Sequence, residues 1–308
     1  MDTLQSLSRE DEAARERLNS ASEDMVQRTC SWSDINTGSW NTAGLKSFAP
    51  VLAGAFSELQ AHIDVIETEG FEAVADSGKT EVQMTGPVIE VTARPEADVQ
   101  VIMSGHYDTV FPEDTFNGPG MADMKGGLCV MLEALKAFEA GSLRDRLGYK
   151  IVLTPDEEIG NFASAEYLTR AAKSGAMIGM TYEPAMETGA MSGGRKGSAV
   201  FDIVLHGKAA HAGRAKEEGR SAIEAAAELV LGLEAMNGTR DGVTLNVGSI
   251  DGGSAVNIVP DLAVVRFGAR APDAESAEWA TSEVRRLFER AIARDGISGH
   301  LHGGFYRP

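Results

Sequence analysis

The stretch Ile151-Val-Leu-Thr-Pro-Asp-Glu-Glu-Ile-Gly160 places an apolar run directly before two adjacent acids, Glu157 and Glu158. The run from Tyr149 to Thr154 is mostly apolar, which is the pattern of a strand buried on both faces of a sheet. Open α/β sheets place their ligand sites in the loops that leave such strands. An acidic pair by itself is usually only a solvated loop, so its meaning depends on what neighbouring strands bring to the same edge.

Strand and helix patterns alternate around this stretch. Further strands are predicted over 88–93, 99–104 and 176–182, and helices over 126–140 and 164–174. This order predicts an α/β domain with a mixed, mostly parallel sheet and helices on both faces. Nearer the N-terminus we expect an amphipathic helix over 3–28, a turn-rich loop over 37–44 and a helix over 45–69 that ends at Gly70.

The pattern changes after Gly193-Gly194. Strands are predicted over 198–207, 244–250 and 262–269, with helices over 221–236 and 274–293. This order favours a small antiparallel sheet backed by two helices, a separate α+β unit of the ferredoxin-like kind. We therefore predict a domain over 1–194, a small inserted domain over 195–302, and the start of a return to the first domain over 303–308.

Composition excludes several classes of function. The 308 residues carry a formal net charge of −18, which repels phosphate backbones and anionic lipid, so we expect neither nucleic acid nor membrane partners. The two cysteines, Cys30 and Cys129, lack the spacing of a disulfide framework or thiolate zinc site. No run of 18 apolar residues and no signal-peptide core is present, so a cytoplasmic protein is predicted.

Four further side chains are candidates for metal chemistry. His106 and Asp108 follow one predicted strand, Asp123 lies in a glycine-rich loop, and Glu183 follows another strand. Imidazole and carboxylate together suit Zn²⁺, Co²⁺ or Mn²⁺, and Asp108 can fix the tautomer of His106. Taken singly, each has a plainer interpretation: a hydrogen-bonded core histidine, an N-capping aspartate at position 123, and an exposed loop acid at position 183. If the strands are neighbours, these groups converge at one edge of the sheet.

At these residues the chain resembles a known family, the zinc metallopeptidases that include glutamate carboxypeptidase, acetylornithine deacetylase, succinyl-diaminopimelate desuccinylase and aminoacylase. The resemblance extends from about Trp40 to Pro308. The motifs that carry it are Gly105-His-Tyr-Asp-Thr109, Gly118-Pro-Gly-Met-Ala-Asp-Met-Lys-Gly-Gly127, Asp156-Glu-Glu-Ile-Gly160, Gly207-Lys-Ala-Ala-His-Ala-Gly213 and Asn257-Ile-Val-Pro260. The glutamate carboxypeptidases are the most similar group.

The resemblance implies a metal centre with divided roles. Asp123 would bridge two Zn²⁺ ions, for which Co²⁺ or Mn²⁺ can substitute. His106 and Glu183 would complete one metal site, and Glu158 would bind the other. Glu157 would be the general base and Asp108 would orient His106. Family members often have a cis peptide bond after the position of Asp123, so we expect one before Met124.

The resemblance also assigns roles to the small domain. His211 would donate to the oxyanion of the reaction, and in dimeric relatives the matching histidine reaches the partner's active site, which implies a homodimer through 195–302. Asn257, Arg270 and Arg307 would hold the substrate's carboxylate, for which an arginine fork is well suited. A solvent-facing histidine at 211 and a plain surface arginine at 270 are the alternatives.

The chain departs from the family pattern in two places. Only 14 residues separate Asp108 from Asp123, fewer than in relatives. Relatives also continue past the position of Pro308 with a glycine-rich loop and a final histidine that ligates the second zinc, and neither His300 nor His302 matches it. A truncated chain is the interpretation we favour, with one metal bound well and the other weakly.

The expected function is hydrolysis of an amide or peptide bond next to a free carboxylate, as in a carboxypeptidase or an N-acyl amino acid deacylase. A biosynthetic deacylase of an N-acyl diamino acid is one alternative. A non-catalytic relative that acts as an interaction or scaffold protein is another, since the final ligand of the second metal is absent. A small molecule or short peptide is the expected substrate, and its identity is not determined by the sequence.

Overall fold

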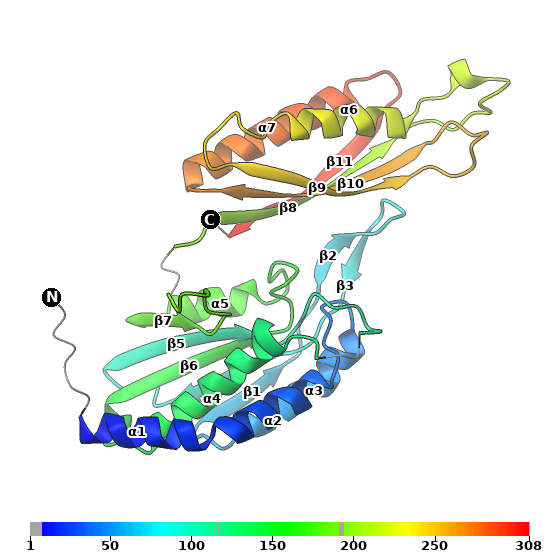
Figure 1. Ribbon diagram of the computed structural model, residues 1–308. Coiled ribbons are helices and arrows are strands. Elements are labelled where there is room, and N and C mark those ends of the chain that lie inside the picture. The colour runs from blue at the N-terminus through cyan, green and yellow to red at the C-terminus, as the bar shows by residue number, and fades with distance from the viewer. Residues whose placement is uncertain (1–7, 116–117, 191–193, 308) are drawn as a thin grey trace. The chain divides into compact units, whose positions relative to one another are not determined.

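The computed structural model describes residues 8–115, 118–190 and 194–306, together with the backbone of Arg307 (Figure 1). Its contacts divide the chain into two compact units. The first consists of Met1–Phe71 and Met84–Met191, and the second of Glu72–Gln83 and Ser192–Pro308. Each unit is described by itself.

A five-stranded sheet forms the centre of the first unit. Its strands are β1 (His62–Ile66), β4 (Val88–Ala93), β5 (Val99–His106), β6 (Leu147–Thr154) and β7 (Ile178–Thr181), in the order β1-β4-β6-β5-β7. Strand β5 is parallel to both β6 and β7, whereas β4 is antiparallel to both β1 and β6. Four strands therefore run in one direction and β4 runs against them, which confirms the mixed, mostly parallel sheet.

Helices cover both faces of this sheet, as predicted (Figure 1). On one face, α3 (Thr42–Phe56) and α4 (Gly126–Glu139) bury a large apolar cluster with alternate residues of β4, β5 and β6. On the other face, α5 (Ala165–Ala172) packs Tyr167 and Ala171 against Val88 and Val152. There Glu90 of β4 accepts from Arg170 of α5 at 2.8 Å, so a buried charge is paired with the covering helix.

Two helix predictions near the N-terminus need correction. The helix expected over 3–28 is two helices, α1 (Arg9–Ser20) and α2 (Ser22–Ser33), and its first residues lie outside the described chain. The helix expected over 45–69 ends at Phe56, and residues 62–66 form β1. Here β-branched Ile63, Val65 and Ile66 pair with β4, so strand pairing overrides a helical spacing of apolar residues.

The second unit contains a four-stranded antiparallel sheet with two helices on one face. Its elements are β8 (Gly197–His206), α6 (Ala222–Glu234), β9 (Thr244–Gly252), β10 (Leu262–Ala271), α7 (Ala274–Ile292) and β11 (Ser298–Arg307). The strand order is β11-β8-β10-β9, so the β-α-β-β-α-β succession forms the expected ferredoxin-like fold. Residues of α6 and α7 enclose one core with the sheet, within which Phe201 and Phe267 stack at 5.1 Å.

A β-hairpin that the sequence did not predict packs on the other face of this sheet. It consists of β2 (Phe71–Val74) and β3 (Thr80–Gln83). Val74 packs against Val204 and Val264, and Arg266 donates to Asp76 at 2.7 Å. A segment of the chain between α3 and β4 therefore belongs to the second unit. Among the described residues, no helix combines the length and apolar character needed to cross a bilayer.

Candidate metal centre

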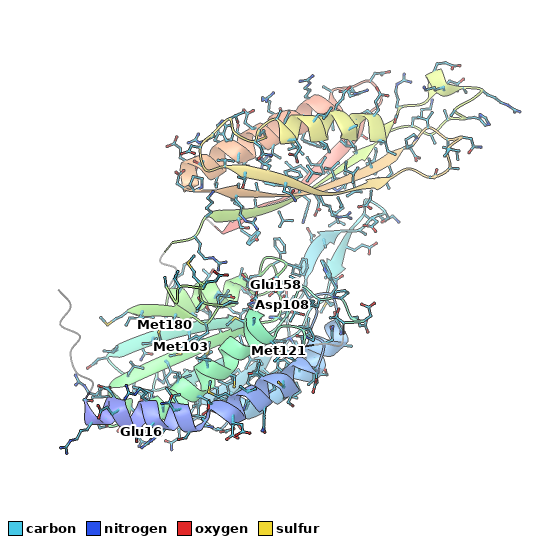
Figure 2. The ribbon with its side chains drawn as sticks, in the orientation of Figure 1. Glu16, Met103, Asp108, Met121, Glu158 and Met180 are labelled. Carbon is cyan, nitrogen blue, oxygen red and sulfur yellow. The ribbon has the colours of Figure 1, made fainter. Side chains whose placement is uncertain are left out.

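Three parallel strands of the first unit deliver the predicted site residues to one edge of the sheet. His106 is the last residue of β5, which lies between β6 and β7. Asp108 follows β5, Glu157 and Glu158 follow β6, and Glu183 follows β7. The carboxyl ends of neighbouring parallel strands meet at one edge, so these groups converge. Figure 2 labels Asp108 and Glu158 at this place.

His106 is a buried imidazole surrounded by carboxylates. Its Nε2 lies 3.1 Å from Oδ1 of Asp123 and 3.7 Å from Oε2 of Glu183, and its Nδ1 lies 3.0 Å from the carbonyl oxygen of Asp108. Burial alone would lower the pKa of His106, but the hydrogen bonds that the protonated ring donates to Asp108, Asp123 and Glu183 outweigh it and raise the pKa. In this arrangement three acids gather around one imidazole.

Asp108 ties this histidine to the acidic pair. Its side chain is fully buried, with Oδ1 accepting from the backbone N–H of Glu157 at 3.0 Å and Oδ2 from that of Glu158 at 3.1 Å. The hydroxyl of Ser39 also donates to Oδ2, at 2.7 Å. One carboxylate thus sets the backbone of both glutamates, while its own oxygen Oδ1 lies 3.3 Å from Nδ1 of His106.

Asp123 lies in a turn just before α4. The peptide bond between Asp123 and Met124 is cis, as expected. The N-cap of α4 is Lys125, so Asp123 is not the capping residue of the plainer interpretation. Its side chain is half exposed and faces Nε2 of His106. Lys125 is fully buried and donates to the carbonyl oxygens of Trp32 and Ile35 at 3.1 and 2.7 Å, which anchors the turn to the end of α2.

Glu158 completes a compact cluster of potential ligands. One ligand atom each of His106, Asp123 and Glu158 lies within 4.8 Å of the others. The pKa of Glu158 is raised to about 7, first by burial and then by the charges of Asp123, Asp108 and Glu157, with His106 acting in the opposite direction. Glu157, its neighbour in sequence, is not part of this cluster.

Glu183 reaches the same edge because the backbone before it comes close to α4. A Cβ on Gly127 would lie 1.9 Å from the carbonyl oxygen of Tyr182, so only glycine permits this approach. The Glu183 side chain is 27% exposed and lies on the Nε2 side of His106. It is therefore brought to the predicted centre, although it stands farther from His106 than Asp123 does.

The donor set fits a divalent metal of the zinc type. Mixed imidazole and carboxylate donors suit Zn²⁺, Co²⁺ and Mn²⁺. Burial and then the neighbouring negative charges raise the pKa of Glu158, and a bound cation would stabilise its charged form. The orientation of His106 also suits metal binding. Its Nδ1 faces the carbonyl oxygen of Asp108, so Nε2 is the nitrogen that points toward the acids and would bind the metal.

In the second unit, the structure brings His211 and Asn257 together. The backbone N–H of Ala212 donates to the carbonyl of Asn257 at 2.9 Å, and His211 forms an isolated bridge with Ile258. Both side chains are exposed. The Nδ1 of His211 accepts from the N–H of Gly213 at 3.1 Å, so in the neutral ring Nε2 carries the proton and can donate.

The two arginine candidates lie elsewhere in that unit. Arg270 and the backbone of Arg307 both pair with Ser198 of β8, one from each side. Arg270 stands eight residues along β10 from Leu262, which is about 26 Å along the strand. The Asn257 loop precedes the other end of β10, so the predicted carboxylate-binding residues form two separated groups. The side chain of Arg307 lies outside the described residues.

Sequence reasoning missed two residues that support the centre, Ser39 and Lys125. Ser39 lies in the turn-rich loop over 37–44, and only the tertiary contact with Asp108 gives it a role. Lys125 is next to a predicted ligand, and its signal was a charged residue at the start of an otherwise apolar helix. Neither is recognisable from spacing alone.

Comparisons with known proteins now identify the group to which the chain is related. Residues 193–296 match the family model described as a peptidase dimerisation domain of the M20 type, and residues 88–203 match that of peptidase family M28. Carboxypeptidase G2 of Pseudomonas sp. (strain RS-16) is 27% identical over 84% of this chain. The chain is similar to M20 peptidases. This confirms the resemblance expected from the motifs.

The curated proteins that the chain matches are longer than it is. The match to carboxypeptidase G2 spans 61% of that protein. Succinyl-diaminopimelate desuccinylase of Gluconobacter oxydans (strain 621H) is 29% identical over 63% of this chain and 54% of its own length. The chain thus spans between half and two thirds of these relatives.

Solved structures show the same fold. The di-peptidase Dug1p of Saccharomyces cerevisiae has a TM-score of 0.72 at 13% identity, over 96% of this chain and 80% of that one. A Bacillus subtilis protein described as a dinuclear metal-binding peptidase of the M20 family has a TM-score of 0.56 at 16% identity, over 94% and 75%. At these identities the likeness concerns the fold alone.

Proposed function

We propose that this M20-type chain is a metal-dependent hydrolase that cleaves an amide or peptide bond next to a free carboxylate. The observation that carries the proposal is the cluster of His106, Asp123 and Glu158 at the carboxyl edge of three parallel strands. Carboxypeptidase G2 and succinyl-diaminopimelate desuccinylase, by their names, act on a peptide's carboxyl end and on an N-succinyl amino acid. Both descriptions involve an amide beside a carboxylate.

Two Zn²⁺ ions are the proposed cofactors, with Co²⁺ or Mn²⁺ as possible substitutes. Asp123 would bridge them, His106 and Glu183 would complete one site, and Glu158 would serve the other. When bound, such ions activate a water molecule and polarise a scissile carbonyl. Supporting this assignment, the donor types are those that zinc takes, and the Nε2 of His106 faces two carboxylates.

Glu157 is the proposed general base. It neighbours Glu158 in sequence and is not one of the three residues of the compact ligand cluster. The backbone N–H of Glu157 donates to Asp108, which fixes the position of the backbone from which the Glu157 side chain extends. Glu157 would take a proton from the attacking water and return it to the leaving amine, the ordinary cycle of a general acid–base catalyst.

Substrate recognition is proposed to involve the second unit. His211 would donate from Nε2 to the developing oxyanion, and Asn257, Arg270 and Arg307 would hold the free carboxylate. His211 and Asn257 lie far from Arg270 along the sheet, which supports a homodimer through residues 195–302 in which the two groups serve different active sites. The match to a peptidase dimerisation domain supports the same assembly. The domain boundaries at 194 and 302 and a cytoplasmic location stay predictions.

The decisive experiment replaces the proposed base. We expect Glu157→Gln to lower kcat for N-acyl amino acid hydrolysis by about 10²–10⁴-fold while zinc binding is unchanged, since the amide keeps the shape but accepts no proton. Glu166→Gln, on the exposed surface of α5, is the matched control and should retain full activity. Emission spectroscopy counts the metal and a panel of N-acyl amino acids and dipeptides measures turnover.

Two results would contradict the proposal. Hydrolysis that persists in Glu157→Gln would remove this residue from the role of base. A wild-type protein that binds zinc but hydrolyses nothing in the panel would favour an interaction or scaffold protein in place of an enzyme.

A further inference from the structure

A hollow of about 450 Å³ opens in the first unit beside the candidate metal centre. Its walls are residues 38–41 of the loop before α3, residues 109–113 after β5, and Glu158 with Ile159. The volume lies within the range of sites that bind small molecules. Since Glu158 is both part of its wall and a proposed metal ligand, anything in the hollow lies next to the metal centre.

Two loops are joined tightly to make these walls. The N–H of Ser39 donates to the carbonyl of Thr109 at 3.0 Å, and the N–H of Thr109 donates to the carbonyl of Thr37 at 2.9 Å. A Cβ on Gly38 would lie 2.3 Å from the carbonyl oxygen of Phe111, so glycine is required at this crossing. Backbone hydrogen bonds and this close approach therefore hold the two walls in place.

Three large apolar side chains at the hollow are open to solvent. Trp40 is 61% exposed, Val110 66% and Phe111 41%. Large apolar side chains left exposed together are a common mark of a binding surface. The ring centroid of Trp40 also lies 6.3 Å from that of Phe71, which lies 5.4 Å from that of Phe162. A row of aromatic rings therefore extends from the hollow.

The acidic side chains at the hollow favour a part of the substrate that carries no negative charge. Glu113 and Glu158 both line the hollow, and among the residues that the structure describes no arginine or lysine does. Glu113, which is not a proposed metal ligand, would repel a free carboxylate there, whereas an uncharged apolar group would bury the rings of Trp40 and Phe111 at no electrostatic cost. The hollow thus suits the end of the substrate that lacks the carboxylate.

We propose that this hollow is the acyl subsite of the enzyme and that it takes an aromatic or large apolar acyl group on the carbonyl side of the scissile amide. Trp40 and Phe111 are its specificity-determining residues. The assignment rests on the proposed hydrolase function, and it adds which chemical class of acyl group the site selects.

Kinetics with two substrates test the subsite. The ratio of kcat/KM for N-benzoylglutamate to that for N-acetylglutamate should fall by about tenfold in Trp40→Ala and in Phe111→Ala, the discrimination expected of an apolar pocket. Trp40→Phe keeps an aromatic ring and should recover most of the ratio. Leu143→Ala truncates a comparably exposed apolar residue outside the hollow and should leave the ratio unchanged. An unchanged ratio in both Ala variants overturns the subsite and leaves the hydrolase proposal intact.

A binding measurement separates the two proposals. 4-Fluorobenzamide carries the ring without a carboxylate, and its ¹⁹F resonance should broaden with wild-type protein and with Leu143→Ala but not with Trp40→Ala. Thermal unfolding of each variant verifies folding. If no amide is hydrolysed but this pattern holds, the hydrolase proposal fails and the hollow remains an aromatic-binding site. If the wild-type protein broadens nothing, the subsite is wrong whatever the turnover.

Discussion

The two oxygens of Asp108 receive donors from three parts of the chain. Backbone N–H groups of Glu157 and Glu158 reach it from the β6 loop, and the hydroxyl of Ser39 reaches it from the loop before α3. The Nδ1 of His106 lies 3.3 Å from Oδ1 of the same carboxylate. A single buried acid thus connects the imidazole of the metal centre, the proposed base and the wall of the hollow.

Replacing Asp108 with asparagine tests this connection. In Asp108→Asn an amide N–H₂ replaces one acceptor oxygen and faces a backbone N–H, so a donor meets a donor and the charge beside His106 is lost. Zinc affinity should fall by about 10–100-fold, the usual cost of losing a group that orients a metal ligand. Competition with a chromophoric chelator measures it.

The control for this change is Asp145→Asn, whose side chain is 77% exposed. It should bind zinc as the wild-type protein does. A zinc affinity within twofold of wild type in Asp108→Asn would show that Asp108 does not position the centre.

At the scale of elements, the turn over 121–125 depends on a buried lysine. Lys125 donates to the carbonyls of Trp32 and Ile35, and its ammonium lies 4.9 Å from the centre of the Phe48 ring. Burial lowers the pKa of Lys125 to about 8. The turn that holds Asp123 is thereby attached to the end of α2, and through it to the apolar core under α3.

Removal of this lysine should destabilise the fold. Lys125→Met keeps the length and apolar stem but leaves the Ile35 carbonyl without its donor, which costs about 1–3 kcal/mol in the free energy of unfolding. Urea denaturation measures the change. Lys46→Met, at a half-exposed ion pair with Glu67, should cost less than about 1 kcal/mol. Equal effects of the two substitutions would rule out a special role for Lys125.

Elements with a strong pattern were predictable and those set by partners were not. The buried strands β5 and β6 and helices α4, α6 and α7 follow the expected bounds within a few residues, since long apolar runs and helical periodicity are local properties. Strand β1 and the β2–β3 hairpin were not found. Their residues are mostly exposed, and pairing with β4 and packing of Val74 on the second unit's sheet decide their conformation.

At the scale of the whole molecule, the described residues contain one compact ligand cluster, while the proposed reaction uses two metals. We expect the 308-residue protein to retain about one zinc per chain after dialysis against a weak chelator, and to bind a second only weakly, because among the described residues the ligands proposed for it are two, Asp123 and Glu158. Emission spectroscopy and zinc titration measure both. Two tightly held zinc ions per chain with full turnover would contradict this expectation.

The candidate site was largely predictable as a set of residues. His106, Asp108, Glu158 and Glu183 follow apolar strands, and the parallel order of β5, β6 and β7 brings them together. Asp123 comes from a glycine-rich loop, and the turn before α4 places it beside His106. The hollow beside Glu158 was not predictable. Its walls come from loops some 70 residues apart in sequence, joined by the bonds between Ser39 and Thr109.

The sequence by itself determined the kind of fold, the chemical types of the candidate ligands and the acidic pair Glu157 and Glu158, because residue type and apolar periodicity are local properties of the chain. Only the tertiary structure decided which of those groups lie together. Strand order brings the loop of both glutamates beside His106, where Glu158 but not Glu157 is part of the ligand cluster, and burial raises the pKa of Glu158 to about 7. These are properties of neighbours in space, which no local pattern records.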